Sequence, residues 1–446
     1  MKFNKQKTSP QLKRRMSPYL IVVLSFLVVI IIGSLLLFFP FSTVEGVKLS
    51  FLDAFFIATS AVTITGLSPV VDLSVSLTVF GKIVLGTLIQ VGGLGIITLS
   101  VFVMILIGAR IGISDRVILQ TNLNTLSLAG VVSLIRKIVL FTFIVEFMGF
   151  LINLIVFIPL FPLPKAIGIS AFHAISAFNN AGFDLLGGSS LVNYHNNILL
   201  LVNTAFLIMI GGLGFIVIED IIRKRSVRKL MIHSKIVLKV NVFLWIIGAL
   251  VIKIAQIGGE STNWLIAFFM SVTARTAGFS VVNLINYHSL SLLMLIFLMF
   301  IGGSPSSTAG GIKTTTFYTL TKSMISFGLG KPTTTYKRLI DQESKNKAFL
   351  LLFVSLSTIG IATGLILLFD NVTITQALFE VASALGNVGL SLSLTSTLTW
   401  GSKIVLIFVM FAGRVGPLTI MSLMNRDWHK LGYHPVDYLE EKIIIG

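Results

Sequence analysis

Four short segments of this chain share one frame, and this internal repeat restricts the possible folds more than any other feature of the sequence. Each segment ends in a glycine, with a phenylalanine ten residues before it. The four pairs are Phe56 and Gly66, Phe172 and Gly182, Phe268 and Gly278, and Phe379 and Gly389. Successive glycines are 116, 96 and 111 residues apart, which leaves room for a helix, a loop and a second helix in each unit. The pattern predicts four fused copies of one structural unit.

The chain is apolar enough for a membrane to be its main solvent. Hydrophobic residues make up 55% of the sequence, charged residues 11%, and the mean hydropathy is +0.96, far from the averages of soluble proteins. Crossing a bilayer takes about 20 apolar residues. Four stretches without formal charge are long enough, at 16–44, 83–109, 185–218 and 348–369. Others contain one charge or break up, at 138–164, 240–259, 290–303 and 404–425. We therefore expect an all-α membrane protein with eight transmembrane helices.

The distribution of Lys and Arg predicts the orientation. If the helices follow one another from an N-terminus inside the cell, 27 of the 34 Lys and Arg residues lie in cytoplasmic segments. This satisfies the positive-inside rule and places both termini in the cytoplasm. The same rule accounts for the net charge of +17, so no nucleic acid partner is expected. The basic loops 223–239 and 313–347 are suited to membrane lipids or a regulatory protein, although solvated loops explain them equally well.

The glycine turns have the chemistry of a cation filter. In a narrow pore, a cation exchanges its hydration water for backbone carbonyl oxygens, and glycine reaches the backbone conformations that turn neighbouring carbonyls the same way. The four turns contain no ring of Asp or Glu, which favours a monovalent ion over calcium. Close helix packing is the alternative role for single glycines, but it does not explain four copies in register. The residues expected at the filter are Thr63, Gly66, Asn180, Gly182, Thr276, Gly278, Asn387 and Gly389.

The second helix of the third unit should break into a polar loop. Pro305 lacks an N–H group, and glycines on both sides weaken the helix further. At membrane depth such a loop must line a cavity, and just below the filter it could obstruct the ion path. A kinked helix end leading to the cytoplasm is the alternative. The loop residues are Gly302, Gly303, Ser304, Pro305, Ser306, Ser307, Thr308, Gly310 and Gly311.

Buried charges mark further sites. Arg414 occupies the equivalent point of the fourth unit, where a charge is costly and usually functional. We expect it to bind loop carbonyls or hydroxyls and to act as a barrier and a latch. Arg275 lies within the third turn, so its side chain should point away from the axis and pair with a buried acid. Glu380 is the expected partner of this structural ion pair, and Glu146 is the alternative. His173 is expected to be a packed core residue rather than a ligand.

Several motifs together resemble the potassium-translocating membrane subunits of the Trk/Ktr/HKT superfamily, most closely the KtrB type. They are SAFNNAGF, TARTAGF, GGSPSSTAGGIKTTTF and FAGRVGPLT, and the resemblance extends over nearly the whole chain. It implies K+ uptake across a bacterial plasma membrane by four fused helix–pore loop–helix repeats, with eight transmembrane helices and four re-entrant pore helices around one pseudo-fourfold pore. K+ would bind the backbone carbonyls of the four filter turns, Thr63 would add an oxygen ligand, and the polar loop would be an intramembrane gate.

The resemblance also implies partners and boundaries. It implies a homodimer with one pore per subunit, a cytoplasmic nucleotide-binding ring of the KtrA/RCK type, and Na+ as an activator. The chain would be a single transmembrane pore domain over 1–446. Its repeats would lie at 16–110, 133–222, 236–325 and 347–426, before a cytoplasmic tail at 427–446. No phosphate-binding fingerprint occurs, so nucleotide control would need the other subunit, and we expect no organic cofactor in this chain.

Two other classes of function fit less well. A secondary active cation symporter, with a midplane site formed by broken helices, would also contain glycine-rich loops, but typical inverted repeats come in two copies. An enzyme is not expected, because the sequence contains no HExxH, GxSxG or paired-carboxylate arrangement.

Overall fold

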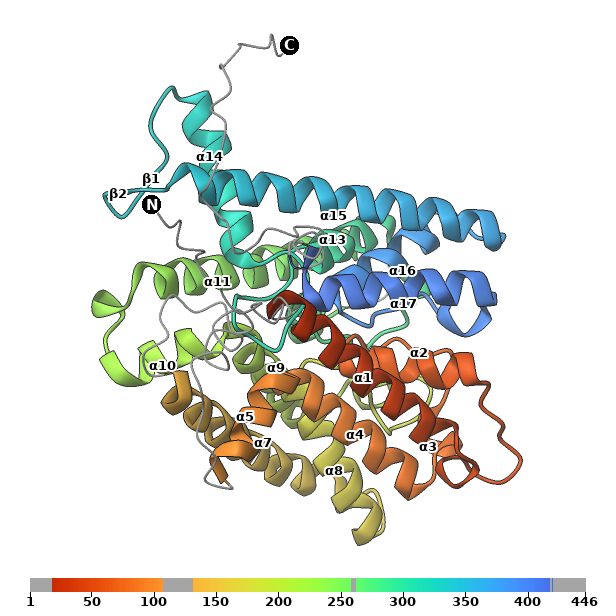
Figure 1. Cartoon of the computed structure of the whole chain (residues 1–446). Helices are drawn as coiled ribbons and strands as arrows, with labels where there is room; N and C mark the ends of the chain where they lie inside the picture. Colours follow the sequence, from red (N-terminus) through yellow and green to blue (C-terminus); the bar gives the residue numbers. More distant parts are fainter. Residues whose placement is uncertain (1–17, 107–130, 258–261, 418, 420–446) are drawn as a thin grey trace, which may run out of the picture.

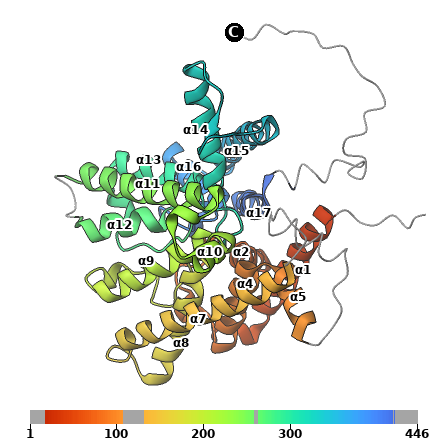
Figure 2. The ribbon, with the colours of Figure 1, turned by 90° about the vertical axis from the view of Figure 1, so that its left-hand side faces the viewer.

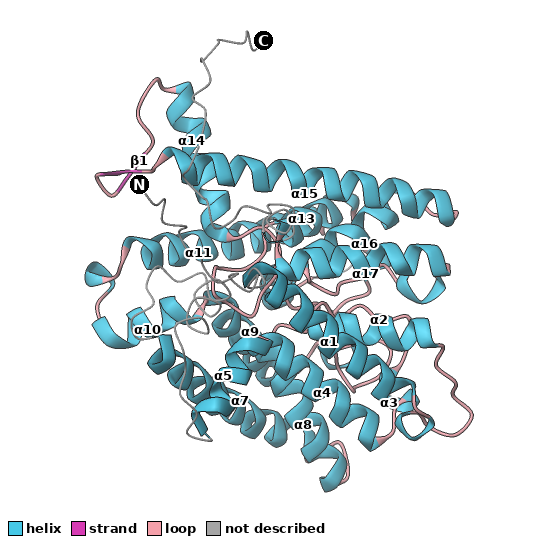
Figure 3. Cartoon of the chain, in the orientation of Figure 1, coloured by secondary structure: helices cyan, strands magenta, loops and turns pink. Residues whose placement is uncertain are grey.

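The computed structural model describes residues 18–106, 131–257, 262–417 and 419. Within these ranges the chain is helical, apart from its loops and one hairpin in which β1 (Thr334–Thr335) pairs antiparallel with β2 (Arg338–Leu339) (Figures 1 and 3). The main helices follow one another four times in the same order, a long helix and then two shorter ones. The expected tail at 427–446 lies outside the described residues.

The four long helices have 21 to 28 residues each. They are α1 (Pro18–Phe38), α7 (Val131–Phe157), α11 (Ile232–Ala255) and α15 (Gln342–Phe369). Large apolar side chains on their outer faces are exposed, for example Phe147 at 59% and Phe353 at 71%. Water does not favour such faces, whereas lipid tails do.

By length and composition, these four helices could cross a membrane, and the described residues contain up to five such spans if one bent helix pair is counted. The expected number of eight transmembrane helices therefore stays a prediction. The other apolar helices in the described ranges have only 10 to 17 residues, and about 20 are needed for a helix to cross the membrane fully.

The first of the two shorter helices in each unit lies in the interior. These helices are α2 (Phe51–Val62), α8 (Leu163–Phe178), α12 (Trp264–Thr273) and α16 (Ile374–Gly386). Side-chain caps start α2, α12 and α16: for example, Ser50 accepts from the Asp53 amide, and Thr373 forms a capping box with Gln376. Helix α8 starts without a side-chain cap. Phe56 and Phe379, two of the aromatic residues that define the repeat, are fully buried.

The second of the two shorter helices connects each unit to the next. These helices are α4 (Val79–Leu94), α9 (Ile198–Leu213), α13 (Ser289–Phe300) and α17 (Trp400–Val415). Helix α4 packs on α8, α9 on α12, α13 on α16, and α17 on α2. The last of these contacts brings the end of the chain back to its beginning. In Figure 2 the four colour groups lie in successive sectors around a common centre.

Glycines break three of these connecting helices. Gly95 and Gly214 have φ values of 84° and 93°, outside the helical region. Gly95 separates α4 from α5 (Ile96–Leu106), and Gly214 separates α9 from α10 (Phe215–Lys224) with a bend of 95°. Gly416, with a φ of 90°, ends α17 in the same way.

The third unit has a longer interruption. Residues 301–313 are not helical and separate α13 from α14 (Thr314–Gly328), which projects from the bundle (Figure 1). The sequence predicts this break correctly. The remaining short elements are α3 (Leu73–Ser76), η1 (Pro40–Ser42), η2 (Val192–Tyr194), η3 (Val227–Lys229), η4 (Leu284–Asn286) and η5 (Thr395–Thr397).

Candidate functional site

The four glycine turns meet and form a closed ring. A methyl group placed on Gly66 would overlap the carbonyl oxygen of Ala181, which is the residue before Gly182. The same relation holds between each turn and the next. The other three pairs are Gly182 with Ala277, Gly278 with Val388, and Gly389 with Thr65. The last pair closes the ring, so the four turns lie around one centre.

All four glycines have positive φ values, between 71° and 94°. Side chains rarely adopt this conformation, and the neighbouring carbonyl also leaves no room for one. Glycine is therefore required at each turn for both reasons. The arrangement brings backbone carbonyl oxygens from four parts of the chain together, which is the kind of environment that replaces the hydration shell of a weakly hydrated cation.

Three of the turns share one backbone geometry. In each, the residue two positions before the glycine also has a positive φ, with values of 55° for Ile64, 59° for Asn180 and 50° for Asn387. The third turn differs: Thr276 has no positive φ, and the Gly278 amide donates to the Thr273 carbonyl at 3.3 Å. The ring is therefore not fourfold symmetric in detail.

Side-chain hydrogen bonds connect the turns in pairs. The Asn180 amide lies 2.6 Å from the Thr276 hydroxyl, and the Asn387 amide donates to the Thr65 hydroxyl at 2.9 Å. The Thr63 hydroxyl donates to the Thr59 carbonyl at 2.7 Å and lies 2.8 Å from that of Thr65. Thr63, Asn180, Thr276 and Asn387 are thus brought together around the ring, and their role toward an ion stays a prediction.

Thr65 was not among the residues expected at the site. In every turn, the carbonyl that meets the neighbouring glycine belongs to the residue directly before the turn's own glycine. Thr65 stands directly before Gly66, and this position is the signal in the sequence that indicates it.

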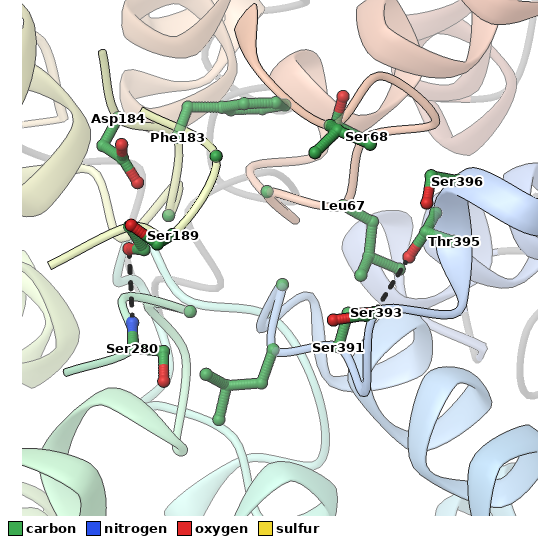
Figure 4. A pocket seen from close by; sticks show the side chains of 18 of the residues that line it. Leu67, Ser68, Phe183, Asp184, Ser189, Ser280, Ser391, Ser393, Thr395 and Ser396 are labelled. Atoms are coloured by element: carbon green, nitrogen blue, oxygen red, sulfur yellow. Dashed lines mark hydrogen bonds between the residues drawn. The ribbon is translucent and has the colours of Figure 1, made fainter. Parts of the chain in front are cut away.

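A cavity of about 450 Å³ opens on one side of the ring (Figure 4). All four glycines line it, together with hydroxyl groups such as those of Ser68, Ser280 and Ser391. Asp184 also lines the cavity, and its carboxylate accepts from the Leu186 amide at 3.1 Å. Burial raises the pKa of Asp184 to about 6. Sequence reasoning missed Asp184, because an acid two residues after a glycine turn carries no recognisable spacing.

The loop at 301–313 is hydrogen-bonded to α8, to α9 and to the first residue of α10. The Ser304 amide donates to the Gly212 carbonyl at 3.1 Å, and the Phe215 amide donates to the Ser306 carbonyl at 2.9 Å. The Thr308 hydroxyl donates to the carbonyl of Phe178, the last residue of α8, at 3.5 Å. Ser304 and Thr308 are fully buried. The loop therefore satisfies carbonyls that the ends of α8 and α9 leave free.

Arg414 connects this loop to the first unit. Its guanidinium donates to the Thr308 carbonyl and to the Gly92 carbonyl near the end of α4, with a longer bond of 3.4 Å to that of Gly93. The expectation that Arg414 binds loop carbonyls is met in this geometry. A planar guanidinium can hold two separate acceptors in this way, whereas a lysine offers a single point of charge.

The predicted ion pair between Arg275 and Glu380 is wrong. None of the ion pairs found among the described residues includes either side chain. The Arg275 guanidinium donates to the Asn241 side chain and to the Gly302 carbonyl. Glu380 accepts from the hydroxyls of Ser391 and Thr395. Arg275 and Glu380 therefore each have hydrogen-bond partners close to their own positions, and neither side chain requires the other as a partner.

Glu146, the alternative partner, is not bound to Arg275 either. Its carboxylate accepts from the side chains of Asn179, at 2.9 Å, and Gln90, at 3.2 Å. His173 is a buried core residue, as expected, and lies 2.9 Å from the Thr204 hydroxyl. Within the described ranges, no three His, Cys, Asp or Glu side chains are grouped so that they could hold a metal ion.

Comparison with known proteins relates this arrangement to a family. The family model TrkH, described as a cation transport protein, matches residues 1–257 and 229–426. The potassium/sodium uptake protein NtpJ of Enterococcus hirae is 37% identical over 98% of this chain and 99% of its own length. The Ktr system potassium uptake protein B of Bacillus subtilis is 36% identical over 91% of this chain and 93% of its own.

A solved structure has the same fold. The potassium transporter TrkH from Vibrio parahaemolyticus superposes with a TM-score of 0.72, over 94% of this chain and 88% of that one, at 21% identity. The resemblance of the sequence motifs to the Trk and Ktr proteins is thereby confirmed, and the chain belongs to the TrkH family of cation transport proteins.

Proposed function

We propose that this protein takes up K+ through a pore whose filter is the ring of four glycine turns. The observation that carries the proposal is the closed sequence of contacts from Gly66 through Gly182 and Gly278 to Gly389 and back. Carbonyl oxygens gathered at one centre suit a dehydrating alkali cation. The names of the relatives, which refer to uptake of potassium or of potassium and sodium, support this class of substrate.

The mechanism that we infer begins at the cavity beside the ring. A hydrated cation enters among hydroxyl groups and the Asp184 carboxylate, and exchanges water for carbonyl oxygens at the turns. The filter side chains hold the ring rather than the ion: the bonds from Asn180 to Thr276 and from Asn387 to Thr65 fix the spacing of neighbouring turns. Because only two of the four junctions have such bonds, we expect moderate discrimination between K+ and Na+.

The loop at 301–313 is the gate in this proposal. Fully buried Ser304 and Thr308 lie against the ends of α8 and α9, and Arg414 holds Thr308 to the first unit. A cation that leaves the filter meets this loop and the positive charge of Arg414. Conduction would require both to move aside.

The resemblance to the Trk and Ktr proteins also supports a proposal for control and assembly. We propose a homodimer with one pore per subunit, both termini in the cytoplasm, and a nucleotide-binding ring of the KtrA/RCK type on the cytoplasmic side. Na+ would activate uptake. The repeat boundaries at 16–110, 133–222, 236–325 and 347–426 belong to the same proposal, with the whole chain as one pore domain.

Flux into liposomes tests the function directly. Purified full-length protein should admit radioactive Rb+ down a gradient, and K+ should compete more strongly than Na+. Replacement of Gly278 by Ser should abolish the preference, because the side chain would displace the Val388 carbonyl. No flux above that of empty liposomes, with correctly folded protein and after addition of a nucleotide-bound regulatory ring, would overturn the proposal.

One observation favours the alternative of a secondary symporter. The 95° bend between α9 and α10 is a broken helix of the kind that builds midplane sites in such transporters. The same liposomes separate the two functions. A pore conducts Rb+ down its own gradient, whereas a symporter moves Rb+ only with a fixed number of Na+ or H+ ions.

A further inference from the structure

One buried cation lies between the filter ring and the gating loop and contacts both. Arg275 belongs to the third glycine turn, and its side chain is 3% exposed. A guanidinium buried in this way needs acceptors, because removing a charge from water is costly unless hydrogen bonds replace the hydration. Its acceptors are neutral, and the face of the Trp245 ring lies 5.9 Å from its central carbon.

The guanidinium reaches the loop by two routes. It donates to the Gly302 carbonyl at 2.7 Å, at the start of the loop. It also donates to the Asn241 side-chain oxygen, and the Asn241 side-chain nitrogen donates to the Ser304 hydroxyl at 3.1 Å. Asn241 is itself buried in α11. Both ends of the segment 302–304 are thus attached to one side chain of the third turn.

The turn that carries this side chain is the one with a different backbone. Ile64, Asn180 and Asn387 have positive φ values, whereas the equivalent Thr276 does not. The Ala277 and Gly278 amides both donate to the Thr273 carbonyl, at 2.9 and 3.3 Å. Among the four turns, the one that departs from the common geometry is therefore the one whose side chain, Arg275, donates to a loop carbonyl.

We propose that Arg275 is a positioning residue that couples the third filter turn to the gating loop, so that displacement of the loop changes the shape of the filter. This inference rests on the proposed function, which makes the ring a filter and the loop a gate. If the loop moves, the Gly302 carbonyl either leaves a buried charge with fewer acceptors or draws the turn with it. Either way, opening and ion discrimination change together.

A cysteine label reports the loop without measuring transport. The chain has no cysteine, so Ser307→Cys provides a single reactive thiol in the loop. In the purified full-length protein, Arg275→Gln should raise the rate at which a maleimide modifies this thiol by about tenfold, the order expected for loss of one hydrogen bond to a charged group. An unchanged rate would contradict the coupling.

Glu380→Gln is the matched control. It also neutralises a fully buried charge in a pore-helix region, but Glu380 bonds to Ser391 and Thr395 and has no contact with the loop. Its labelling rate should equal that of the parent. If Arg275→Gln does not fold, Asn241→Leu removes the second route and leaves Arg275 in place; it should raise the rate in the same direction. Equal rates for Asn241→Leu and the parent would overturn the inference.

A double-mutant cycle tests the effect on the filter. The measured quantity is the ratio of Rb+ to Na+ flux for the parent, for Arg275→Gln, for deletion of residues 304–310, and for both changes together. Coupled sites give non-additive effects, so the double variant should resemble the deletion alone. Additive effects would mean that Arg275 stabilises the turn but is not coupled to the loop. No flux in the parent protein would instead refute the proposed function, and the labelling result would still decide the coupling.

Discussion

The Glu146 carboxylate accepts a hydrogen bond of 2.9 Å from the side chain of Asn179, which stands three residues before Gly182 of the glycine ring. Gln90 of α4 donates to the same carboxylate at 3.2 Å. Glu146 is 6% exposed and lies on α7, a helix that faces outward on its other side. One buried acid thus connects the end of α8 to α4, the connecting helix of the first unit.

Replacing Glu146 with Ala should destabilise the protein by about 1–3 kcal/mol, because the Gln90 side-chain nitrogen would lose its acceptor. Asn179 would keep its bonds to Gln90 and to the Ile175 carbonyl. Glu146→Gln is the control, since it retains one acceptor oxygen in nearly the same shape. Thermal unfolding of both variants in detergent measures the difference. Equal loss of stability in the two variants would mean that the retained acceptor oxygen contributes nothing, and would contradict the role assigned to these hydrogen bonds.

Adding a single methyl group to the ring should impair conduction. Gly389 has a φ of 94°, and a side chain there would overlap the Thr65 carbonyl. The strain of about 1–3 kcal/mol must displace either the turn or the carbonyl. We expect Gly389→Ala to lower Rb+ flux by about tenfold or more, the change that corresponds to 1.4 kcal/mol.

Gly364→Ala is the control for this change. Gly364 lies within α15, and a methyl group there would meet no atom within 4 Å. Alanine is favoured over glycine in a helix by roughly 0.5–1 kcal/mol, so flux should stay at the level of the parent and stability should not fall. A loss of flux in both variants would show that the assay is sensitive to any added side chain.

The sequence predicts the ring better than it predicts the partners of the charged residues. Each glycine of the ring is placed by a local pattern, a phenylalanine ten residues before a glycine turn, and four copies in register reveal it. The partner of Arg275 depends instead on how α11 crosses the third turn. From the sequence alone, a carboxylate is a better acceptor for a guanidinium than a side-chain amide or a backbone carbonyl, and the sequence therefore predicts Glu380 rather than Asn241 and Gly302.

The helix breaks illustrate the same limit. Pro305 predicts the break between α13 and α14 in the third unit, because proline disrupts the interior of a helix. The breaks at Gly95 and Gly214 have no such local cause, since a glycine in an apolar stretch is compatible with a helix as well as with a turn. At Gly214 the break accompanies tertiary packing, because a side chain there would overlap the Pro305 carbonyl of the loop.

Removing the guanidinium of Arg414 should open the pore. Arg414→Ala deletes the bonds to the Thr308 and Gly92 carbonyls and the positive charge near the ion path, so we expect Rb+ flux to rise several-fold. Lys403→Ala is the control, because Lys403 lies on the same helix but pairs with Asp53 at 2.7 Å and has no contact with the loop. Its flux should be unchanged. If Arg414→Ala shows the same Rb+ flux as the parent protein, Arg414 does not take part in gating.

Uptake should depend on external pH through Asp184. Burial raises the pKa of this carboxyl to about 6; hydrogen bonds from Leu186 and Ser190 oppose the rise, and the charge of Asp72 adds to it. The folded protein therefore binds the proton more tightly than the unfolded chain. The stability that this group contributes is greatest below its ordinary pKa of 3.8 and is lost as the pH rises to about 6.

Conduction should follow the opposite trend. Above pH 6 the ionised carboxylate attracts cations into the cavity beside the ring, and below it the neutral acid does not. At subsaturating Rb+, uptake should rise a few-fold between an external pH of about 5 and about 7, and Asp184→Asn should remove this step and leave uptake low. Glu45→Gln, which alters an exposed acid outside the cavity, should keep the step. A step of equal size in the Asp184 variant would assign the pH dependence to another group.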